Sequence, residues 1–260
     1  MTTHMIIPDS HANPDIPNDR FLWAGRLALE RKPDVIINIG DWLDMESLCS
    51  YDRGKKQFEG RRYHRDIACG NAALDLFEQP IREYNFQQAL HKKKQYKPRK
   101  VWLDGNHEHR VTRAEEDNPA MESMLPIHKE LGLKRRGWDV SAFLVPVHID
   151  GVVYQHFFTS GPMGNSISGH FSGRRIIQEI HRSGTCGHSH YFNYFHDTDG
   201  FGNQLHGLVV GCFFEHPVTY TSIKDQQKWW RGIVFKNNVS NGDYDLETIR
   251  LSTIKEMYSD

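Results

Sequence analysis

Short apolar runs alternate with amphipathic stretches through the first hundred residues. The runs lie at residues 5–7, 34–39 and 100–103. Their continuous, largely β-branched character is typical of strands covered on both faces. Between the first two runs, an Asn-Asp pair can cap a helix over residues 18–31. A second stretch with helical spacing, residues 67–84, contains Pro80, so we expect a kink or a break in that helix.

The second half of the chain is richer in strand patterns. Residues 141–149 and 152–158 flank Asp150-Gly151, a dipeptide that favours a hairpin turn. Residues 173–181 can form a helix. Further strands are expected at residues 191–196, 204–210, 231–236 and 247–254. Together these patterns predict two stacked mixed sheets with helices outside, a four-layer α/β/β/α sandwich.

Composition limits the class of protein. The chain has 260 residues, enough for one large domain with a substantial core. No apolar run approaches the roughly 20 residues that span a bilayer, and the first residues lack the apolar core of a signal peptide. The four cysteines form no C-x-x-C pair. We therefore expect a cytoplasmic protein of one domain, residues 1–260, with no membrane association and no obligate protein partner.

Charge is uneven although the formal net charge is only −1. Lysine and arginine concentrate in residues 52–65 and 91–100. Both segments fall in a basic helical insertion that we expect at about residues 48–98. A solvated face is the ordinary interpretation of such segments. The alternative is a patch that steers a polyanionic substrate, such as a nucleic acid, towards the site.

Polar motifs follow the predicted strands, where open α/β sheets bind their ligands. They are Asp9-Ser10-His11, Gly40-Asp41-Trp42-Leu43-Asp44, Gly105-Asn106-His107-Glu108, His156 and Gly187-His188-Ser189-His190. Carboxylates, an amide oxygen and imidazoles are the donors of two-metal centres, whose ions lie about 3.5–4 Å apart. This mixture suits manganese, iron, zinc or nickel better than calcium or magnesium. We expect two divalent transition-metal ions, with manganese the first choice.

The ordered set resembles the calcineurin-like metallophosphoesterase superfamily, whose pattern is D-x-H, GDxxD, GNH(D/E), H and GHxH. The resemblance extends from residue 9 to residue 190. It implies that the first ion is bound by Asp9, His11, Asp41 and His190. It implies that the second is bound by Asp41, Asn106, His156 and His188. His170 is the rival of His156, which we expect in the middle of a strand.

The same resemblance assigns His107 and Asp44 to catalysis rather than to metal binding. His107 would act as general acid or as an electrostatic stabiliser of the phosphate. Asp44 would orient the imidazole and favour its charged form. Glu108 is expected to support the site from outside. Arg110 and Arg113 could touch phosphate, but a surface helix face is the preferred interpretation.

The expected reaction is hydrolysis of a phosphate ester by a hydroxide that bridges both ions. Protein phosphatases of the superfamily have GDxxDRG and an arginine before GNHE. Here Met45-Glu46 and Asp104 stand at those places, which disfavours that subclass. The resemblance therefore favours a compact phosphodiesterase or phosphatase of the bacterial and phage type. The substrate would be a phosphate ester, and a nucleotide or a nucleic acid is among the candidates.

Two alternatives stay open. A DNA nuclease of the same superfamily would explain the basic segments. Against it, the superfamily's repair nucleases usually have GNHD and a capping domain, whereas this chain has GNHE. The other alternative is a non-catalytic binding scaffold, which should have lost ligands. Every ligand position of the family has a candidate here, so this alternative is remote.

Overall fold

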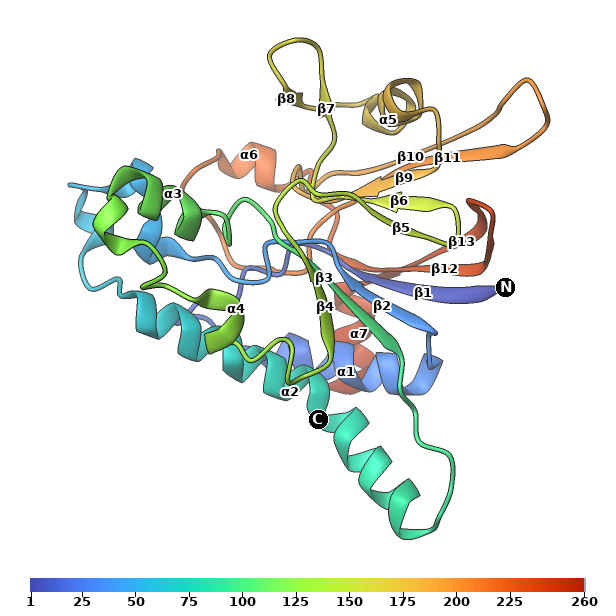
Figure 1. The fold of residues 1–260 in the computed structure, drawn as a ribbon, viewed down its shortest axis with the longest axis horizontal. Helices are drawn as coiled ribbons and strands as arrows, with labels where there is room; N and C mark the ends of the chain where they lie inside the picture. The colour runs from blue at the N-terminus through green and yellow to red at the C-terminus, as the bar shows by residue number, and fades with distance from the viewer. Residues whose placement is uncertain (260) are drawn as a thin grey trace.

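The structure is a computed structural model that describes residues 1–259 (Figure 1). The larger of its two main sheets, called the first sheet below, is mixed and has six strands. Its strand order is β13-β12-β1-β2-β3-β4. The strands are β1 (Thr2–Ile7), β2 (Val35–Asn38), β3 (Arg99–Leu103), β4 (Trp138–Ser141), β12 (Gly232–Ser240) and β13 (Asp243–Arg250). β1 to β4 are parallel, β12 is antiparallel to β1, and β13 is antiparallel to β12.

A five-stranded mixed sheet has the order β10-β11-β9-β6-β5. Its strands are β5 (Val147–Ile149), β6 (Val152–Tyr154), β9 (Gly184–Cys186), β10 (Phe192–Thr198) and β11 (Gln204–Val210). The expected hairpin is confirmed, because Ile149 pairs with Val152 across a turn in which Asp150 and Gly151 both have positive φ. A small separate sheet joins β7 (Thr159–Ser160) to β8 (Asn165–Ser166).

Helices lie on the outer faces of the two larger sheets (Figure 1). α1 (Asp19–Arg31), α2 (Tyr63–Leu90) and α7 (Leu251–Tyr258) pack beside the first sheet. α5 (Ser172–Ile180) packs on β10 and β11 of the second sheet. The shorter helices are α3 (Arg110–Asp117), α4 (Ile127–Glu130), α6 (Ile223–Gln226), η1 (Glu46–Leu48), η2 (Ser50–Asp52), η3 (Lys56–Phe58) and η4 (Pro119–Met121). The fold is therefore mixed α/β, as the sequence predicts.

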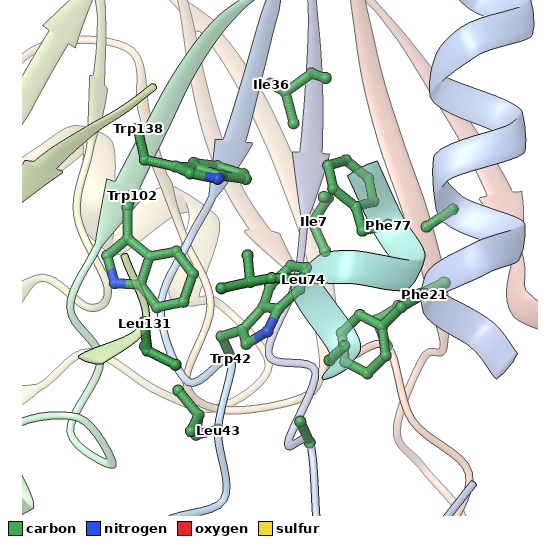
Figure 2. Packing of buried hydrophobic residues seen from close by; sticks show 14 of the residues in the cluster. Ile7, Phe21, Ile36, Trp42, Leu43, Leu74, Phe77, Trp102, Leu131 and Trp138 are labelled. Carbon is green, nitrogen blue, oxygen red and sulfur yellow. The ribbon is translucent and has the colours of Figure 1, made fainter. Parts of the chain in front are cut away.

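The largest core cluster fills the space between α1, α2 and the first sheet (Figure 2). Trp42 is fully buried there, with ring centroids 4.6 Å from Phe21 and 5.7 Å from Trp102. α2 contributes Leu74 and Phe77 to the same cluster. Burying a large aromatic side chain contributes roughly 2–3 kcal/mol. Because Trp42 follows Asp41 directly, this packing fixes the loop that presents the motif carboxylate.

The cap expected at Asn18 is wrong, and of the kink or break expected at Pro80 the break is absent. Asn18 precedes α1, but its side chain makes no capping bond. Its amide instead donates to the carbonyl oxygen and Sγ of Cys69 on α2. Pro80 lies inside α2 without splitting it. The proline removes only one backbone hydrogen bond, and packing of the helix on α1 and the sheet holds both sides of that position.

Three expected strands of the second half are also wrong in extent or type. Residues 141–149 do not form one strand, because Ser141 ends β4 in the first sheet and only Val147–Ile149 joins the second. The strand expected at 152–158 stops at Tyr154. Residues 251–254 begin α7 instead of continuing a strand. Leu251 and Ile254 are buried one helical turn apart, a spacing typical of a helix face.

No helix within residues 1–259 combines the length and the apolar character that crossing a membrane requires.

Candidate metal centre

The motif residues meet where five strands end. Asp9 follows β1, Asp41 follows β2, and Asn106 follows β3 of the first sheet. From the second sheet, His156 follows β6, and β9 precedes the motif with two histidines. His156 lies two residues beyond its strand, not in the middle of it. The stacked sheets thus bring together residues that are up to 181 positions apart, from Asp9 to His190.

Three overlapping groups of donors occur at these strand ends. Atoms that could hold a metal ion lie within 4.8 Å of one another in Asp9, His11 and His190, in His11, Asp41 and His107, and in Asp41, His156 and His188. Oδ2 of Asp41 lies 3.6 Å from Nε2 of His11 and 3.4 Å from Nε2 of His156. Asp41 therefore stands between the groups, as a bridging ligand must.

Asn106 and His156 complete the group around Asp41 and His188. Oδ1 of Asn106 lies 2.9 Å from Nε2 of His156 and 2.8 Å from Nδ1 of His188. Nδ1 of His156 lies 3.0 Å from the carbonyl oxygen of Ile39, to which its N–H donates. That bond directs Nε2 towards Asp41, the usual arrangement of a metal-binding histidine. His170, the rival candidate, is exposed and lies outside all three groups.

Unpartnered buried atoms provide a test of whether these residues fit a metal. Oδ1 of Asp9 and both ring nitrogens of His11 are buried without a hydrogen-bond partner. Buried polar atoms in proteins nearly always have a partner. Carboxylate oxygen and imidazole nitrogen are the ligands of divalent transition metals. The buried His and Asp groups of this site could hold a metal ion.

Four of the seven candidate ligands adopt a left-handed backbone conformation. The φ values are 45° for His11, 54° for Asp41, 68° for His188 and 61° for His190. A residue other than glycine adopts this conformation at a cost of roughly 1–2 kcal/mol. Such strain concentrates at functional sites, where the surrounding structure maintains it. Here the carbonyl oxygen of Asp41 accepts from the backbone N–H groups of Ser10 and His11, at 2.9 and 3.0 Å.

Close approach explains two of the motif glycines. A Cβ atom at Gly105 would lie 2.0 Å from Oδ1 of Asp41. A Cβ atom at Gly187 would lie 2.2 Å from Oδ1 of Asp9. Both distances are well inside van der Waals contact, so any side chain at these positions would displace a candidate ligand.

Glu108 supports the site by binding the backbone of its loops, which agrees with the expected supporting role. Its carboxylate accepts hydrogen bonds from the backbone N–H groups of Asp41 at 2.9 Å, Leu43 at 3.1 Å and Gly105 at 2.9 Å. One side chain therefore joins the loop after β2 to the loop after β3. Burial, with the nearby charges of Asp41 and Asp104, raises the pKa of Glu108 to about 7.

His107 lies beside the bridging carboxylate and contacts Asp44. Its Nδ1 lies 2.6 Å from the carbonyl oxygen and 3.3 Å from Oδ1 of Asp44. Its backbone N–H donates to Oδ1 of Asp41 at 2.8 Å. Burial lowers the pKa of His107 despite the nearby carboxylates. Asp44 thus contacts the ring and favours its charged form, as expected, but burial outweighs this contribution and the net pKa of His107 is lowered.

Arg110 is a site residue that the sequence interpretation placed on a surface. Nη1 of Arg110 donates to the carbonyl oxygens of Asp44 and Met45, at 2.8 and 3.1 Å. Nη2 lies 3.1 Å from Nε2 of His107. An arginine can only donate, so Nε2 of His107 accepts and Nδ1 carries its proton. Arg110 therefore sets the tautomer of His107, which no local pattern could have indicated.

A cavity of about 830 Å³ opens over the metal groups. Besides the motif residues it is lined by parts of 46–57 and 216–229. His216 lines it, and its ring centroid lies 4.6 Å from that of Phe214 with the planes tilted by 33°. Burial lowers the pKa of His216 to about 4. Trp229 contacts the ring of His190 edge-on at 4.4 Å. The sequence interpretation missed both residues, since each lies outside the motifs.

The two basic segments lie differently with respect to this cavity. Residues 91–98 connect α2 to the start of β3, so they lie at the opposite end of the sheet from the site (Figure 1). Arg61 is close to the cavity but is paired with Glu46 and Asp52, at 2.9 and 2.8 Å. Arg65 is paired with Asp15 at 2.8 Å. The charges of Arg61 and Arg65 are therefore already neutralised by carboxylates.

Comparison of the chain with models of known protein families found no match, and no curated protein is significantly similar to it. The resemblance to metallophosphoesterases therefore depends on the five motifs and on the geometry that joins them. Its consequences for activity are proposals.

Proposed function

We propose that this protein is a metal-dependent hydrolase of phosphate esters with a dinuclear centre. The observation that carries the proposal is the position of Asp41. Its buried carboxylate lies between two groups of donors, 3.6 Å from His11 and 3.4 Å from His156. One carboxylate shared by two sets of nitrogen and oxygen donors is the arrangement that a two-metal hydrolase requires.

The ions would be held by the ligands expected from the resemblance, and manganese remains the first choice. The first would be bound by Asp9, His11, Asp41 and His190, and the second by Asp41, Asn106, His156 and His188. When bound, such ions supply a hydroxide nucleophile at neutral pH and neutralise the charge of the phosphoryl oxygens. The unpartnered atoms of Asp9 and His11 support this assignment, because a metal would satisfy them.

The protein's own side chains would bind and orient the ester. Arg110 offers a guanidinium cation and reaches the site beside His107. It is therefore the better cation for a phosphoryl oxygen. Nε2 of His107 accepts from Arg110 in this structure, so it would serve the leaving oxygen once Arg110 donates to the phosphate instead and the ring takes up a second proton, while Asp44 holds Nδ1. Trp229 and Phe214 form an apolar wall beside His190 and His11 that limits access of water.

The arrangement of layers supports the expected four-layer sandwich. α1, α2 and α7 pack beside the first sheet, a second hydrophobic cluster lies between the sheets, and α5 covers the second sheet. Leu74 and Phe77 make α2 part of the core, so the basic helical insertion expected at about 48–98 would include an integral layer. A cytoplasmic location stays part of the proposal.

A panel of phosphate esters with the manganese-loaded protein tests the function. It should include bis-p-nitrophenyl phosphate, p-nitrophenyl phosphate, cyclic nucleotides, single- and double-stranded DNA, and a phosphopeptide. We expect turnover of at least one ester and its loss in Asp41→Asn. His170→Gln is the matched control, since His170 is exposed and outside all three donor groups. A protein that binds two ions and hydrolyses none of these esters would instead favour the scaffold alternative.

A further inference from the structure

A second, smaller cavity adjoins the metal centre. Its volume is about 350 Å³, within the range of small-molecule sites. It shares Asn106, Arg110 and His188 with the main cavity and adds Arg113, Phe143 and Phe157. A molecule in this side cavity would therefore lie against the ligands of the second ion. Neither the motifs nor the proposed chemistry assigns it a role.

Charge distinguishes the two cavities. The main cavity is lined by six carboxylates. They are Asp15, Asp41, Asp44, Glu46, Asp52 and Asp225. The side cavity is lined by none, and it contains the guanidinium groups of Arg110 and Arg113. In the main cavity these carboxylates outnumber the two cationic side chains, Lys55 and Arg110, so away from the metals an anionic group attached to the bound phosphate would meet mainly negative charge. It would be attracted into the side cavity.

Both arginines have donors to offer. Arg113 donates through Nη2 to Oγ of Ser50 at 3.0 Å. Arg110 donates to backbone carbonyl oxygens. Within the described chain, neither forms an ion pair with a carboxylate. A guanidinium has five N–H donors in a planar fork that matches a phosphate. Arg113 uses one of these donors in its bond to Ser50, so the other N–H groups of its guanidinium could donate to a phosphate in this cavity.

Aromatic rings form one wall of the side cavity. The ring of Phe157 lies 4.6 Å from that of His188, and the ring of Phe143 lies 5.6 Å from that of Phe157. His109 stacks on Phe143 at 4.4 Å, with an interplanar angle of 18°. This row of rings begins at a candidate metal ligand and leads away from it. Planar aromatic faces beside a cation are the combination that binds single nucleotides of a strand.

We propose that the side cavity binds the nucleotide adjacent to the scissile phosphate, with its base against Phe143 and Phe157 and its distal phosphate on Arg113. This assignment rests on the proposed function and names its substrate class, a nucleotidyl phosphodiester. Arg110, which contacts both His107 and the cavity, connects the two phosphates. The basic loop at residues 91–98 has no part in this binding, because it lies at the other end of the sheet.

The test compares thymidine dinucleotides with and without a 5′-phosphate. Steady-state hydrolysis is measured with the manganese-loaded protein. Binding of the same dinucleotides is measured by saturation-transfer NMR with the metal-free protein, which cannot turn them over. Arg113→Gln removes the proposed phosphate contact. Arg175→Gln is the matched control, because Arg175 also lies on a helix and also donates through Nη2 to a serine hydroxyl, Oγ of Ser160, at 2.8 Å.

We expect the 5′-phosphate to increase kcat/KM about tenfold in the wild type and in Arg175→Gln, and to give little increase in Arg113→Gln. Phe143→Leu should weaken binding of both dinucleotides by about tenfold, through lost stacking. The subsite is overturned if the 5′-phosphate gives no gain in either assay, or if Arg113→Gln keeps the full gain. If no diester is hydrolysed but binding still depends on Arg113 and the 5′-phosphate, the proposed function fails and the subsite stands.

Discussion

Two clusters of buried polar side chains occur in this molecule, and they differ in how their atoms are satisfied. The metal cluster consists of the seven candidate ligands at the strand ends. The interior cluster lies within strands of both sheets and consists of His4, Tyr154, Thr185 and Lys236. All four members of the interior cluster are fully buried. Burial alone therefore does not distinguish a site from a structural network.

The side-chain polar groups of these four residues all have partners, although the buried hydroxyl of Tyr244, whose ring lies 4.2 Å from Nζ of Lys236, has none. Nδ1 of His4 lies 2.7 Å from the hydroxyl of Tyr154, and Nε2 lies 2.9 Å from Oδ2 of Asp150. Nζ of Lys236 donates to Oγ1 of Thr185 and lies 4.6 Å from the ring centroid of Tyr154. None of the four members has positive φ. A satisfied, unstrained network of this kind stabilises the packing of the two sheets.

The metal cluster shows the opposite properties. It contains buried atoms without partners in Asp9 and His11, and four of its backbones are left-handed. Unsatisfied groups and strain both lower stability. They persist where a ligand uses them. The comparison therefore predicts that changes in the metal cluster affect metal binding and activity, whereas changes in the interior cluster affect the free energy of unfolding.

The largest expected effect is that of Asp41→Asn. Both ions share this carboxylate, so metal content should fall further than after any other single change. The free energy of unfolding of the metal-free protein should stay the same or rise, because asparagine tolerates positive φ well. Elemental analysis and urea unfolding measure the two quantities. Asp150→Asn, which changes a partner of His4 at the edge of the interior cluster, is the control and should keep both ions. Loss of metal from the Asp150→Asn variant would contradict the proposed difference between the metal cluster and the interior cluster.

The next effect is that of His107→Gln on the rate. A general acid or base typically contributes about 10²–10⁴-fold, so kcat should fall by that order while both ions stay bound. The loss should be smaller for an aryl ester, whose leaving group scarcely needs a proton. Elemental analysis accompanies the kinetics. Loss of metal would show that His107 is a ligand, and equal losses on both kinds of ester would indicate phosphate binding.

Lys236→Met should change how stability depends on pH. Burial lowers the pKa of Lys236 well below its ordinary value. Between that lowered pKa and about 10.4 the unfolded chain binds a proton that the folded chain does not. Stability of the wild type should therefore rise with pH relative to Lys236→Met, by up to about 1.4 kcal/mol per pH unit. Urea unfolding of both proteins at about pH 7, 8 and 9 measures the difference. Parallel curves would show that the lysine is not penalised by burial.

Tyr154→Phe tests the interior cluster without changing its shape. Loss of the hydroxyl leaves Nδ1 of His4 buried without its partner at 2.7 Å. An unsatisfied buried group costs about 1–3 kcal/mol. The free energy of unfolding should decrease by that amount, and metal content should not change. Adding His4→Phe to Tyr154→Phe replaces the unpartnered imidazole with an apolar ring. If the unpartnered imidazole causes the loss of stability, the double variant should recover part of it.

The sequence predicts the metal cluster far better than the interior cluster. Asp9, Asp41 and Asn106 follow recognisable strands, and their spacing within motifs is a local property. His4 and Lys236 have no local signal. Each lies inside a strand, and its partners are decided by how the two sheets stack. Arg110 was misinterpreted for the same reason, because its contacts with Asp44 and Met45 cross the site.

The errors in predicting the fold from the sequence have a related cause. The strand expected over residues 141–149 is divided between two sheets, and nothing in its alternation marks the place where the chain crosses. Residues 251–254 are apolar at positions that suit either a strand or a helix over so short a stretch. Packing against α1 decides in favour of α7. Tertiary contacts therefore settle what short patterns leave open.

The smallest expected effect compares glycine and alanine in the two clusters. His190 has φ of 61°, a conformation that glycine adopts readily and alanine does not. In the metal-free protein, His190→Gly should therefore be more stable than His190→Ala, by about 1 kcal/mol. His4 lies in β1 with ordinary strand geometry. There the order should reverse, because glycine in a strand costs roughly 0.5–1 kcal/mol relative to alanine.

Urea unfolding of the four variants without metal measures both differences, and each pair of variants shares the loss of the same imidazole. The comparison therefore isolates the backbone contribution from the side-chain contribution. Opposite signs at positions 190 and 4 would show that strain is confined to the strand ends that present the ligands. If alanine is as stable as glycine at position 190, the left-handed backbone stores no strain. Metal binding would then depend on the donor atoms alone.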